Sequence, residues 1–156
     1  MDTRLPCVTV FLKPIYLWLD NIEKAENLHR PHHNLAKALL VAGFYDEGIL
    51  EMEKALHAKV GARITQKLVT YYNLGLYYFL QGQYDKSLDQ HFKMLEYLPD
   101  NPKIYRRIAI VLFAKGDLPL AEKYIMKALT SDPDSPELRQ TLNSILAKKR
   151  KRGEVP

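Results

Sequence analysis

The chain has 156 residues, of which 47% are apolar, with one cysteine and a formal net charge of +5. This length and composition fit one globular domain with a substantial core and exclude a disordered majority, while the lone Cys7 excludes an intramolecular disulfide and a cysteine zinc site. The charge is local, because the run Lys148–Arg152 holds five of the 23 basic residues and the remaining 18 balance the 18 acidic ones.

The N-terminal segment is apolar, but a lysine and a proline at positions 13 and 14 interrupt it. Its apolar run is shorter than the roughly 20 residues of a membrane-spanning helix. We expect residues 1–13 to be extended or loosely docked. Residues 14–28 are predicted to be a half-repeat, since Trp18 precedes Met52 by the same spacing that separates equivalent positions of the later repeats.

The first complete unit, residues 29–62, is predicted to be a pair of helices that turns at Gly43. The spacing from Gly43 to the next equivalent glycine, Gly82, is longer than the spacing from Gly82 to Gly116. Five additional residues therefore lie between positions 59 and 68, where we expect a longer helix or a bulged connection.

The second and third units, residues 68–101 and 102–135, repeat one pattern at a constant offset. The matched pairs include Tyr71 and Tyr105, Gly82 and Gly116, and Pro99 and Pro133. Their offset equals the period of stacked helix-turn-helix units, which is about 34 residues. Glycine accepts the left-handed conformation that ends a helix, and the prolines break the second helices. Small residues let the two helices of each unit approach closely. They are Ala36 and Gly48, Gly75 and Ser87, and Ala109 and Ala121.

Residues 136–149 are predicted to form a terminal capping helix with Ser135 as its N-cap. Its apolar face consists of Leu138, Leu142, Ile145 and Leu146. The basic tail, residues 148–156, follows. Its cations could bind RNA or anionic lipid, whereas the simpler interpretation is a frayed, solvated helix end.

The second unit resembles the tetratricopeptide repeat family, whose pattern is an aromatic, Leu-Gly, Tyr, a small residue and a closing Pro. The matching residues are Tyr71, Leu74, Gly75, Tyr78, Ser87 and Pro99. The resemblance implies an all-α fold: an α-solenoid of about three helix pairs over residues 14–147, with an N-terminal half-repeat helix and a C-terminal capping helix. It also implies a protein–protein interaction scaffold or adaptor.

The first helix of each pair lines the concave face in this family. Carrying those positions over predicts a groove with a basic lip and an apolar, aromatic floor, suited to an extended or helical acidic peptide. The partner-binding candidates are His33, Lys37, Tyr72, Asn73, Leu76, Phe79, Lys103, Arg106, Arg107 and Ile110, with Arg30, Asn34, Leu40, Val69 and Phe113 as further lining positions.

Two interpretations of this groove stay open. Asn73, Lys103 and Arg107 match three of the five positions with which cochaperones of the family clamp a C-terminal carboxylate, whereas His33 and Lys37 depart from that pattern. Alternatively, the cations are simply solvated, and the aromatic side chains at positions 72, 79 and 113 belong to the core between repeats.

Four histidines, His29, His32, His33 and His57, invite a metal interpretation. However, Pro31 interrupts the first turn, no acidic or cysteine ligand completes a set, and the repeat assigns His32 to a buried aromatic position. Neither a nucleophile–base pair nor a phosphate-binding glycine loop stands out. We therefore predict no metal, no cofactor and no enzymatic activity.

Two other functions are alternatives: a nucleic-acid or anionic-membrane surface binder through Lys148–Arg152, and a self-assembling homo-oligomeric module. We expect a cytoplasmic location. The segment Leu17–Ala36 also resembles the junction at which some bacterial multi-pass membrane proteins, related to mannosyltransferases, pass into tetratricopeptide tails. That resemblance implies, as the alternative, the extracytoplasmic face of an inner membrane.

Overall fold

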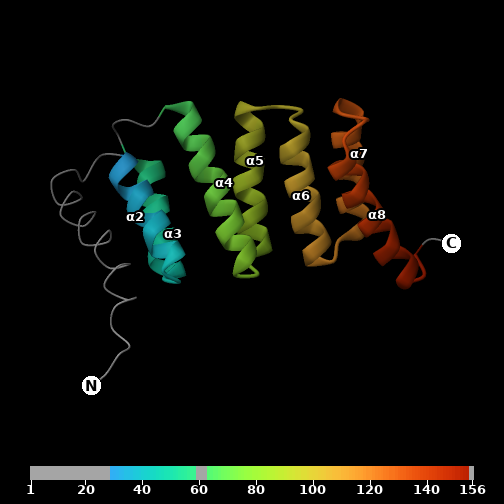
Figure 1. The fold of residues 1–156 in the computed structure, drawn as a ribbon, viewed down its shortest axis with the longest axis horizontal. Coiled ribbons are helices and arrows are strands. Elements are labelled where there is room, and N and C mark those ends of the chain that lie inside the picture. The colour runs from blue at the N-terminus through green and yellow to red at the C-terminus, as the bar shows by residue number, and fades with distance from the viewer. Residues whose placement is uncertain (1–28, 59–62, 155–156) are drawn as a thin grey trace, which may run out of the picture. The chain divides into compact units, whose positions relative to one another are not determined.

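The computed structural model describes residues 29–58 and 63–154, and within these ranges the chain is all-α, with seven helices and no strand (Figure 1). The helices are α2 (His29–Val41), α3 (Tyr45–His57), α4 (Ile64–Leu80), α5 (Tyr84–Tyr97), α6 (Pro102–Lys115), α7 (Leu118–Ser131) and α8 (Pro136–Lys151). The predicted all-α class is confirmed. The expected N-terminal segment, 1–13, and the half-repeat, 14–28, lie outside the described residues.

The helices belong to two compact units, residues 1–77 and residues 78–156, and the boundary between them falls inside α4. The described part of the first unit contains α2, α3 and most of α4. The second unit contains the end of α4 together with α5, α6, α7 and α8.

Glycines end the first helices where the sequence predicted them. Gly43, Gly82 and Gly116 have φ angles of 88°, 73° and 96°, a left-handed conformation that disfavours residues with a Cβ. The start of α6 also follows the prediction, since Pro102 occupies its first turn and the Asn101 side chain accepts from two backbone amides. The predicted cap of α8 is wrong in detail, because the Ser135 hydroxyl donates to the Glu137 carboxylate instead of accepting from an amide.

In the first unit, α2 and α3 pack closely because small residues occupy their crossing point. Ala36 is fully buried, and Gly48 is buried against it. A Cβ on Gly48 would lie 2.5 Å from the Leu40 Cγ and 3.2 Å from the Ala36 carbonyl oxygen. No real Cβ tolerates the shorter distance, so the absence of a side chain at Gly48 sets the approach of the two helices.

The extra residues before the second repeat lengthen a helix. α4 has 17 residues, compared with 13 in α2 and 14 in α6, and it begins at Ile64 instead of the predicted position 68. Of the two expected outcomes, the longer helix is the one observed, while residues 59–62 lie outside the described residues.

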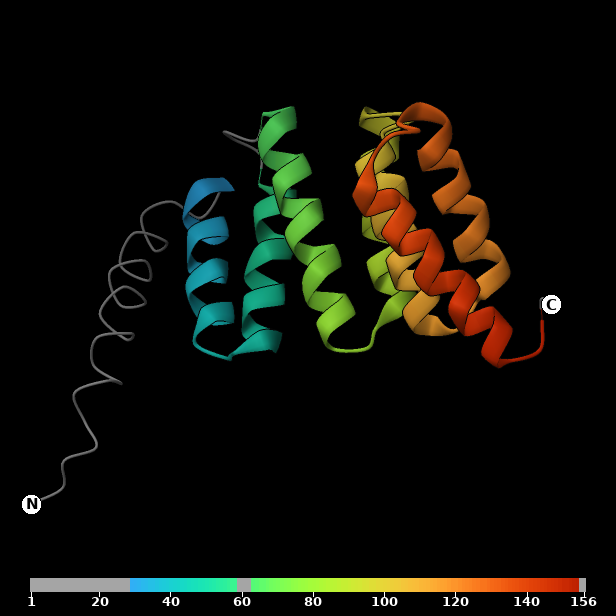
Figure 2. The ribbon, with the colours of Figure 1, turned by 45° about the vertical axis from the view of Figure 1, so that its right-hand side comes forward.

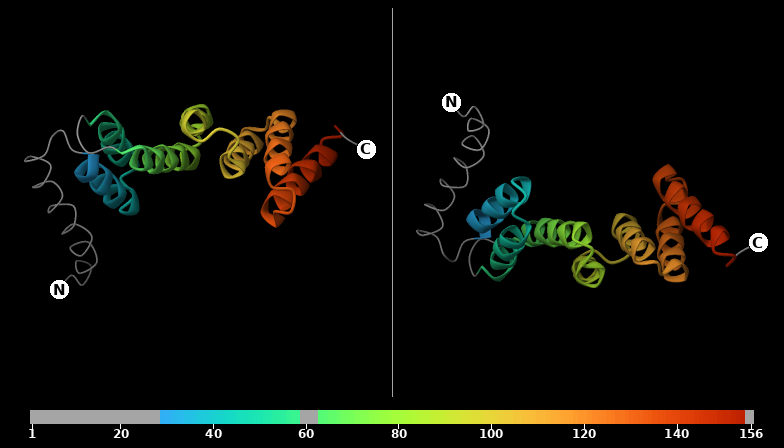
Figure 3. Two further views of the ribbon diagram at one scale, coloured as in Figure 1. Left: turned by 90° about the horizontal axis from the view of Figure 1, so that it is seen from above. Right: turned by 90° about the horizontal axis from the view of Figure 1, so that it is seen from below.

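In the second unit, α6 lies between α5 and α7, and α8 lies against α7 and α6 (Figures 2 and 3). The core between α6 and α7 is formed by Ile108, Ala109, Ala121 and Ile125, all of them fully buried. Ala109 and Ala121 are the small residues that the repeat pattern assigned to this crossing. Ile145, also fully buried, anchors the apolar face of α8 as predicted for a capping helix.

The basic run at the C-terminus is helical, so the expected fraying is wrong, whereas residues 150–152 are exposed as the solvated interpretation expects. α8 continues to Lys151. The Lys148 Nζ donates to the Phe113 carbonyl oxygen at 3.1 Å, and the Arg152 guanidinium donates to the Gly116 carbonyl oxygen at 3.0 Å. Both carbonyls lie at the C-terminus of α6, where backbone acceptors lack helical partners and the helix dipole attracts cations.

Candidate partner-binding site

All ten candidate groove residues lie on α2, α4 and α6, the first helices of the pairs. His33, Lys37, Tyr72, Asn73 and Leu76 belong to the first unit, whereas Phe79, Lys103, Arg106, Arg107 and Ile110 belong to the second. None of them is buried, and Lys37 and Lys103 are exposed. Of the further lining positions, Leu40 was wrongly assigned to the groove, because it is 4% exposed and packs in the core against Gly48 of α3. Because the structure describes each unit by itself, a single groove across both units stays a prediction.

The aromatic candidates are neither free surface residues nor core residues. Tyr72, Phe79 and Phe113 are all half-buried. The Phe79 ring lies 5.8 Å from the ring of Tyr84, and the Lys148 ammonium lies 4.3 Å from the centre of the Phe113 ring. Each of these side chains is thus partly covered by an intramolecular neighbour, and both interpretations of the groove stay predictions.

In the first unit, a pocket of about 410 Å³ opens between α2 and α4. Its lining consists of His29, Arg30, His33 and Asn34 from α2, and of Thr65, Gln66 and Val69 from α4. Arg30, His33, Asn34 and Val69 are positions that the sequence assigned to the groove. Thr65 and Gln66 were missed because α4 was expected to begin after them; a spacing of three to four residues back from Val69 would have found both.

Two histidines of this pocket converge on one buried hydroxyl. The His29 Nε2 lies 2.9 Å from the Thr70 Oγ1, and the His33 Nδ1 lies 3.1 Å from the same oxygen. Thr70 donates its only hydrogen to the Gln66 carbonyl oxygen at 2.9 Å. Both imidazoles must therefore donate to Thr70, which fixes their tautomers and leaves the His29 Nδ1 and the His33 Nε2 as acceptors.

The surroundings of these two histidines favour their neutral forms. Burial lowers the pKa of His33 to about 4, and the neighbouring His29 and Lys37 add to the effect. Burial also lowers the pKa of His29, with smaller contributions from Arg30, His32 and Lys67. The two rings stack with their centres 5.4 Å apart, an arrangement that two imidazolium cations would oppose.

His32 is buried, as the repeat pattern predicted, and its side chain contacts α3. Its Nδ1 lies 2.7 Å from a carboxylate oxygen of Glu51, and the other oxygen of Glu51 lies 2.5 Å from the Lys54 ammonium. Two histidines of α2 thus contact Thr70 of α4, and the third contacts Glu51 of α3. Across residues 29–58 and 63–154, no group of three or more potential ligands is arranged to hold a metal ion.

In the second unit, two candidate cations of α6, Lys103 and Arg106, lie near α8. The Arg106 Nε donates to the Thr141 hydroxyl at 3.1 Å. The backbone amide of Glu137 and the hydroxyl of Ser135 lower the pKa of the Glu137 carboxyl, and Arg106 and Lys103 contribute to the same effect. The predicted basic lip therefore includes one carboxylate, which neutralises part of its charge.

Arg107 lies close to a buried histidine of α5. His91 is 3% exposed, and among the described residues its Nδ1 has no hydrogen-bond partner. Burial lowers the pKa of His91 to about 4, and Arg107 reinforces the shift. Arg107 thus influences the interior of the unit as well as its surface.

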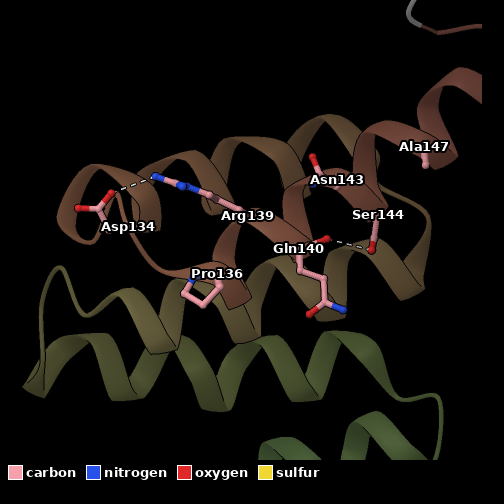
Figure 4. A pocket seen from close by; sticks show the side chains of 7 residues that line it. All are labelled: Asp134, Pro136, Arg139, Gln140, Asn143, Ser144 and Ala147. Atoms are coloured by element: carbon pink, nitrogen blue, oxygen red, sulfur yellow. Dashed lines mark hydrogen bonds and ion pairs between the residues drawn. The ribbon is translucent and has the colours of Figure 1, made fainter.

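A second, wide depression lies on the exposed side of α8 (Figure 4). Its rim is polar: Arg139 forms an ion pair with Asp134 at 3.0 Å, and the Ser144 hydroxyl donates to the Gln140 carbonyl oxygen. One repeat earlier in the sequence, the positions of Arg139 and Asn143 are occupied by the buried Tyr105 and Ala109. These polar replacements suit a helix whose free side faces solvent.

Comparisons with known proteins agree with the helix-pair architecture. Residues 78–151 match the model of a tetratricopeptide repeat family. The curated relative BBSome complex member BBS4 of Bos taurus is 25% identical over 101 residues, which are 65% of this chain but only 18% of that protein.

Solved structures give the same result. MamA from Desulfovibrio magneticus RS-1 has a TM-score of 0.73 at 15% identity, covering 92% of this chain and 77% of that chain. The APC/C hetero-tetramer Cut9–Hcn1 contains a chain with a TM-score of 0.70 at 19% identity, covering 88% and 28%. At these identities the similarity shows the fold alone, an α-solenoid of helix pairs.

Two further expectations concern membranes. None of the helices in the described ranges is long and apolar enough to cross a bilayer. Most of the segment that resembles a membrane-protein junction, residues 17–28, lies outside the described residues, so that resemblance stays an expectation.

Proposed function

We propose that the chain is a tetratricopeptide repeat protein, which the match over residues 78–151 supports, and that it is a non-enzymatic scaffold that binds a protein partner through the faces of its first helices. The observation that carries this proposal is that side chains at the inward positions stay accessible. On α6, Lys103 is exposed and Ile110 is half-buried, so a cationic and an apolar group are available on the same helix. A peptide with apolar and acidic side chains complements such a face.

Two of the similar proteins are named as parts of assemblies. BBS4 is a member of the BBSome complex, and Cut9 forms a hetero-tetramer with Hcn1. Membership of an assembly is the role expected of a chain whose first helices offer accessible surface. These names support a partner protein for the present chain without indicating which one.

The hydroxyl of Thr70, which lies beside two histidines, is not an activated nucleophile. Thr70 contacts two histidines, but it is fully buried and gives its hydrogen to a backbone carbonyl. Neither imidazole has a lone pair directed at the hydroxyl hydrogen, so neither acts as its base. This contact holds α2 against α4 and supports the proposal of a non-enzymatic chain.

A peptide-binding screen tests this proposal. The full chain is presented to a library of acidic and neutral peptides, and Lys103→Ala with Ile110→Ala is compared with Lys123→Ala, an exposed lysine of α7. We expect the double variant to weaken binding of selected peptides by at least about tenfold and the control to leave it unchanged. Equal affinities for all three proteins would refute binding at the α6 face.

A nucleic-acid or membrane function through the C-terminal cations has less support. Lys148 and Arg152 are held by α6 carbonyls, and Lys149 forms an ion pair with Glu122 at 2.7 Å. Only Arg150 and Lys151 of the run remain exposed without such a contact in the described residues. Two free cations predict a slope of about −2 in a plot of log affinity against log salt concentration. Light scattering at two protein concentrations tests the self-assembling alternative.

A further inference from the structure

The pocket between α2 and α4 offers hydrogen-bond donors without a competing carboxylate. Arg30 and Thr65 are exposed, Asn34 is half-buried, and within the described residues no hydrogen bond or ion pair engages these three side chains. The Gln66 side-chain oxygen accepts from the Arg63 amide at 3.2 Å, which leaves the side-chain NH₂ of Gln66 available. Four donor side chains thus surround one opening of about 410 Å³.

We propose that this pocket binds the phosphate group of a phosphorylated peptide, with Arg30, Asn34, Thr65 and Gln66 as its hydrogen-bond donors. The inference deepens the scaffold function and rests on it, since it assigns a chemical class to one part of the partner. A guanidinium offers several N–H groups in a planar arrangement that matches phosphate oxygens. The hydroxyl and the two amides supply neutral donors for the remaining oxygens.

The local electrostatic field favours a doubly charged anion. Thr65 and Gln66 lie in the first turn of α4, and neither α2 nor α4 has an acidic residue in its first turn. The positive end of the α4 dipole is therefore not neutralised by a helical carboxylate. Three cations add to the field: Arg30 and Lys67 act on His29, and Lys37 acts on His33.

The histidines at the base of the pocket distinguish phosphate from carboxylate. Their donors are committed to Thr70, so the His33 Nε2 and the His29 Nδ1 are acceptors, and the His29 Nδ1 is buried without a partner in the described residues. A carboxylate at neutral pH carries no hydrogen for these acceptors. A phosphate monoester has a second pKa near 6, so its singly protonated form keeps a hydroxyl that can donate a hydrogen bond to an imidazole nitrogen.

This arrangement couples binding to proton uptake. Free His33 and His29 are neutral at pH 7, and the charged groups that act on them from α2 and α4 are the cations Arg30, Lys37 and Lys67. A bound dianion offsets these cations and raises the pKa of the imidazoles, so the complex holds more protons than the separate partners.

The first experiment uses inorganic phosphate, with acetate as the carboxylate probe at equal ionic strength, and follows backbone amides of the full chain by NMR. We expect saturable shifts at the Thr65 and Gln66 amides with phosphate and weaker shifts with acetate. Arg30→Ala should reduce phosphate affinity at least about fivefold, while Lys123→Ala leaves it unchanged. Both replaced residues are exposed, so folding is not at risk.

The second experiment compares a phosphoserine peptide with its unphosphorylated and glutamate forms, and adds vesicles that contain a phosphoinositide. Preference for the phosphoserine peptide that depends on Arg30 supports the proposal. Equal binding of phosphate and acetate, shifts spread over surface lysines, or Arg30-dependent binding of vesicles alone would each overturn it. Peptide binding that depends on Lys103 but not on Arg30 or phosphate would leave the scaffold function intact and reject this site.

Discussion

The buried histidine of α5 should make the stability of the second unit depend on pH. His91 is 3% exposed, and burial together with Arg107 lowers its pKa to about 4 from the ordinary 6.5. Below pH 6.5 the unfolded chain binds a proton at this position that the folded chain does not bind until the pH approaches 4. The contribution is therefore fully present above pH 6.5 and is lost as the pH falls toward 4.

The size of this effect follows from the two pKa values. Each unit of difference corresponds to about 1.4 kcal/mol, so the difference between 6.5 and about 4 corresponds to a limiting loss of about 3 kcal/mol. Between pH 7 and pH 5 the expected loss is about 2 kcal/mol. Solvent screening is small for a side chain that is almost completely buried, so the figure needs little discount.

The assay compares the full chain with His91→Phe by urea denaturation at pH 7, 6 and 5. Phenylalanine keeps an aromatic ring of similar shape and removes both the titration and the unpartnered Nδ1. The free energy of unfolding of the variant at pH 7 should therefore be between equal to that of the parent and about 1 kcal/mol higher. His29 and His33 also make the free energy of unfolding fall as the pH falls. Both residues are present in the parent and in the His91→Phe variant, so the difference between the two plots of unfolding free energy against pH isolates His91.

An NMR titration of the imidazole provides the direct control. Arg107→Gln should move the pKa of His91 upward, because a cation that opposes protonation is removed. If His91 in the folded chain titrates near 6.5, or if His91→Phe loses stability with pH as steeply as the parent, the argument from burial is refuted.

Three further substitutions test the packing by thermal or urea denaturation. Gly48→Ala places a Cβ 2.5 Å from a buried carbon of Leu40 and should cost about 1–3 kcal/mol; an unchanged midpoint would show that α2 and α3 can separate freely. Glu51→Ala removes the buried acceptor of His32 and should cost about 1–3 kcal/mol, whereas the isosteric glutamine variant should cost less. Truncation before Lys148 removes three contacts to α6 and α7 and should cost about 1–3 kcal/mol; a truncated chain as stable as the parent would return the tail to the solvated interpretation.

The helices and their ends were predictable from the sequence because their signals are local. Gly82 and Gly116 end the first helices of their units because each adopts the left-handed conformation that a helix end requires. The prolines at positions 99 and 133 prevent the second helices from continuing. The repeat period then assigned Ala109 and Ala121 to the crossing of α6 and α7, where both are fully buried. Such features depend only on a residue and its neighbours along the chain.

The start of α4 was less predictable. Five extra residues between Gly43 and Gly82 were recognised, but the sequence left open whether they lengthen a helix or form a bulge. α4 begins at Ile64, four residues before position 68, and Thr65 and Gln66 consequently became part of the pocket. Their place in the pocket therefore depends on whether the additional residues extend the helix or form a bulge.

The polar contacts were decided by the tertiary structure alone. His29 meets Thr70 across 41 residues of sequence, and Lys148 meets the Phe113 carbonyl across 35. The repeat period indicates which helices are neighbours, but it does not fix which side chains meet, because that depends on the rotation and register of each helix within its unit. The same contacts decide which histidines stay neutral and which cations remain free, since burial and partners set those properties.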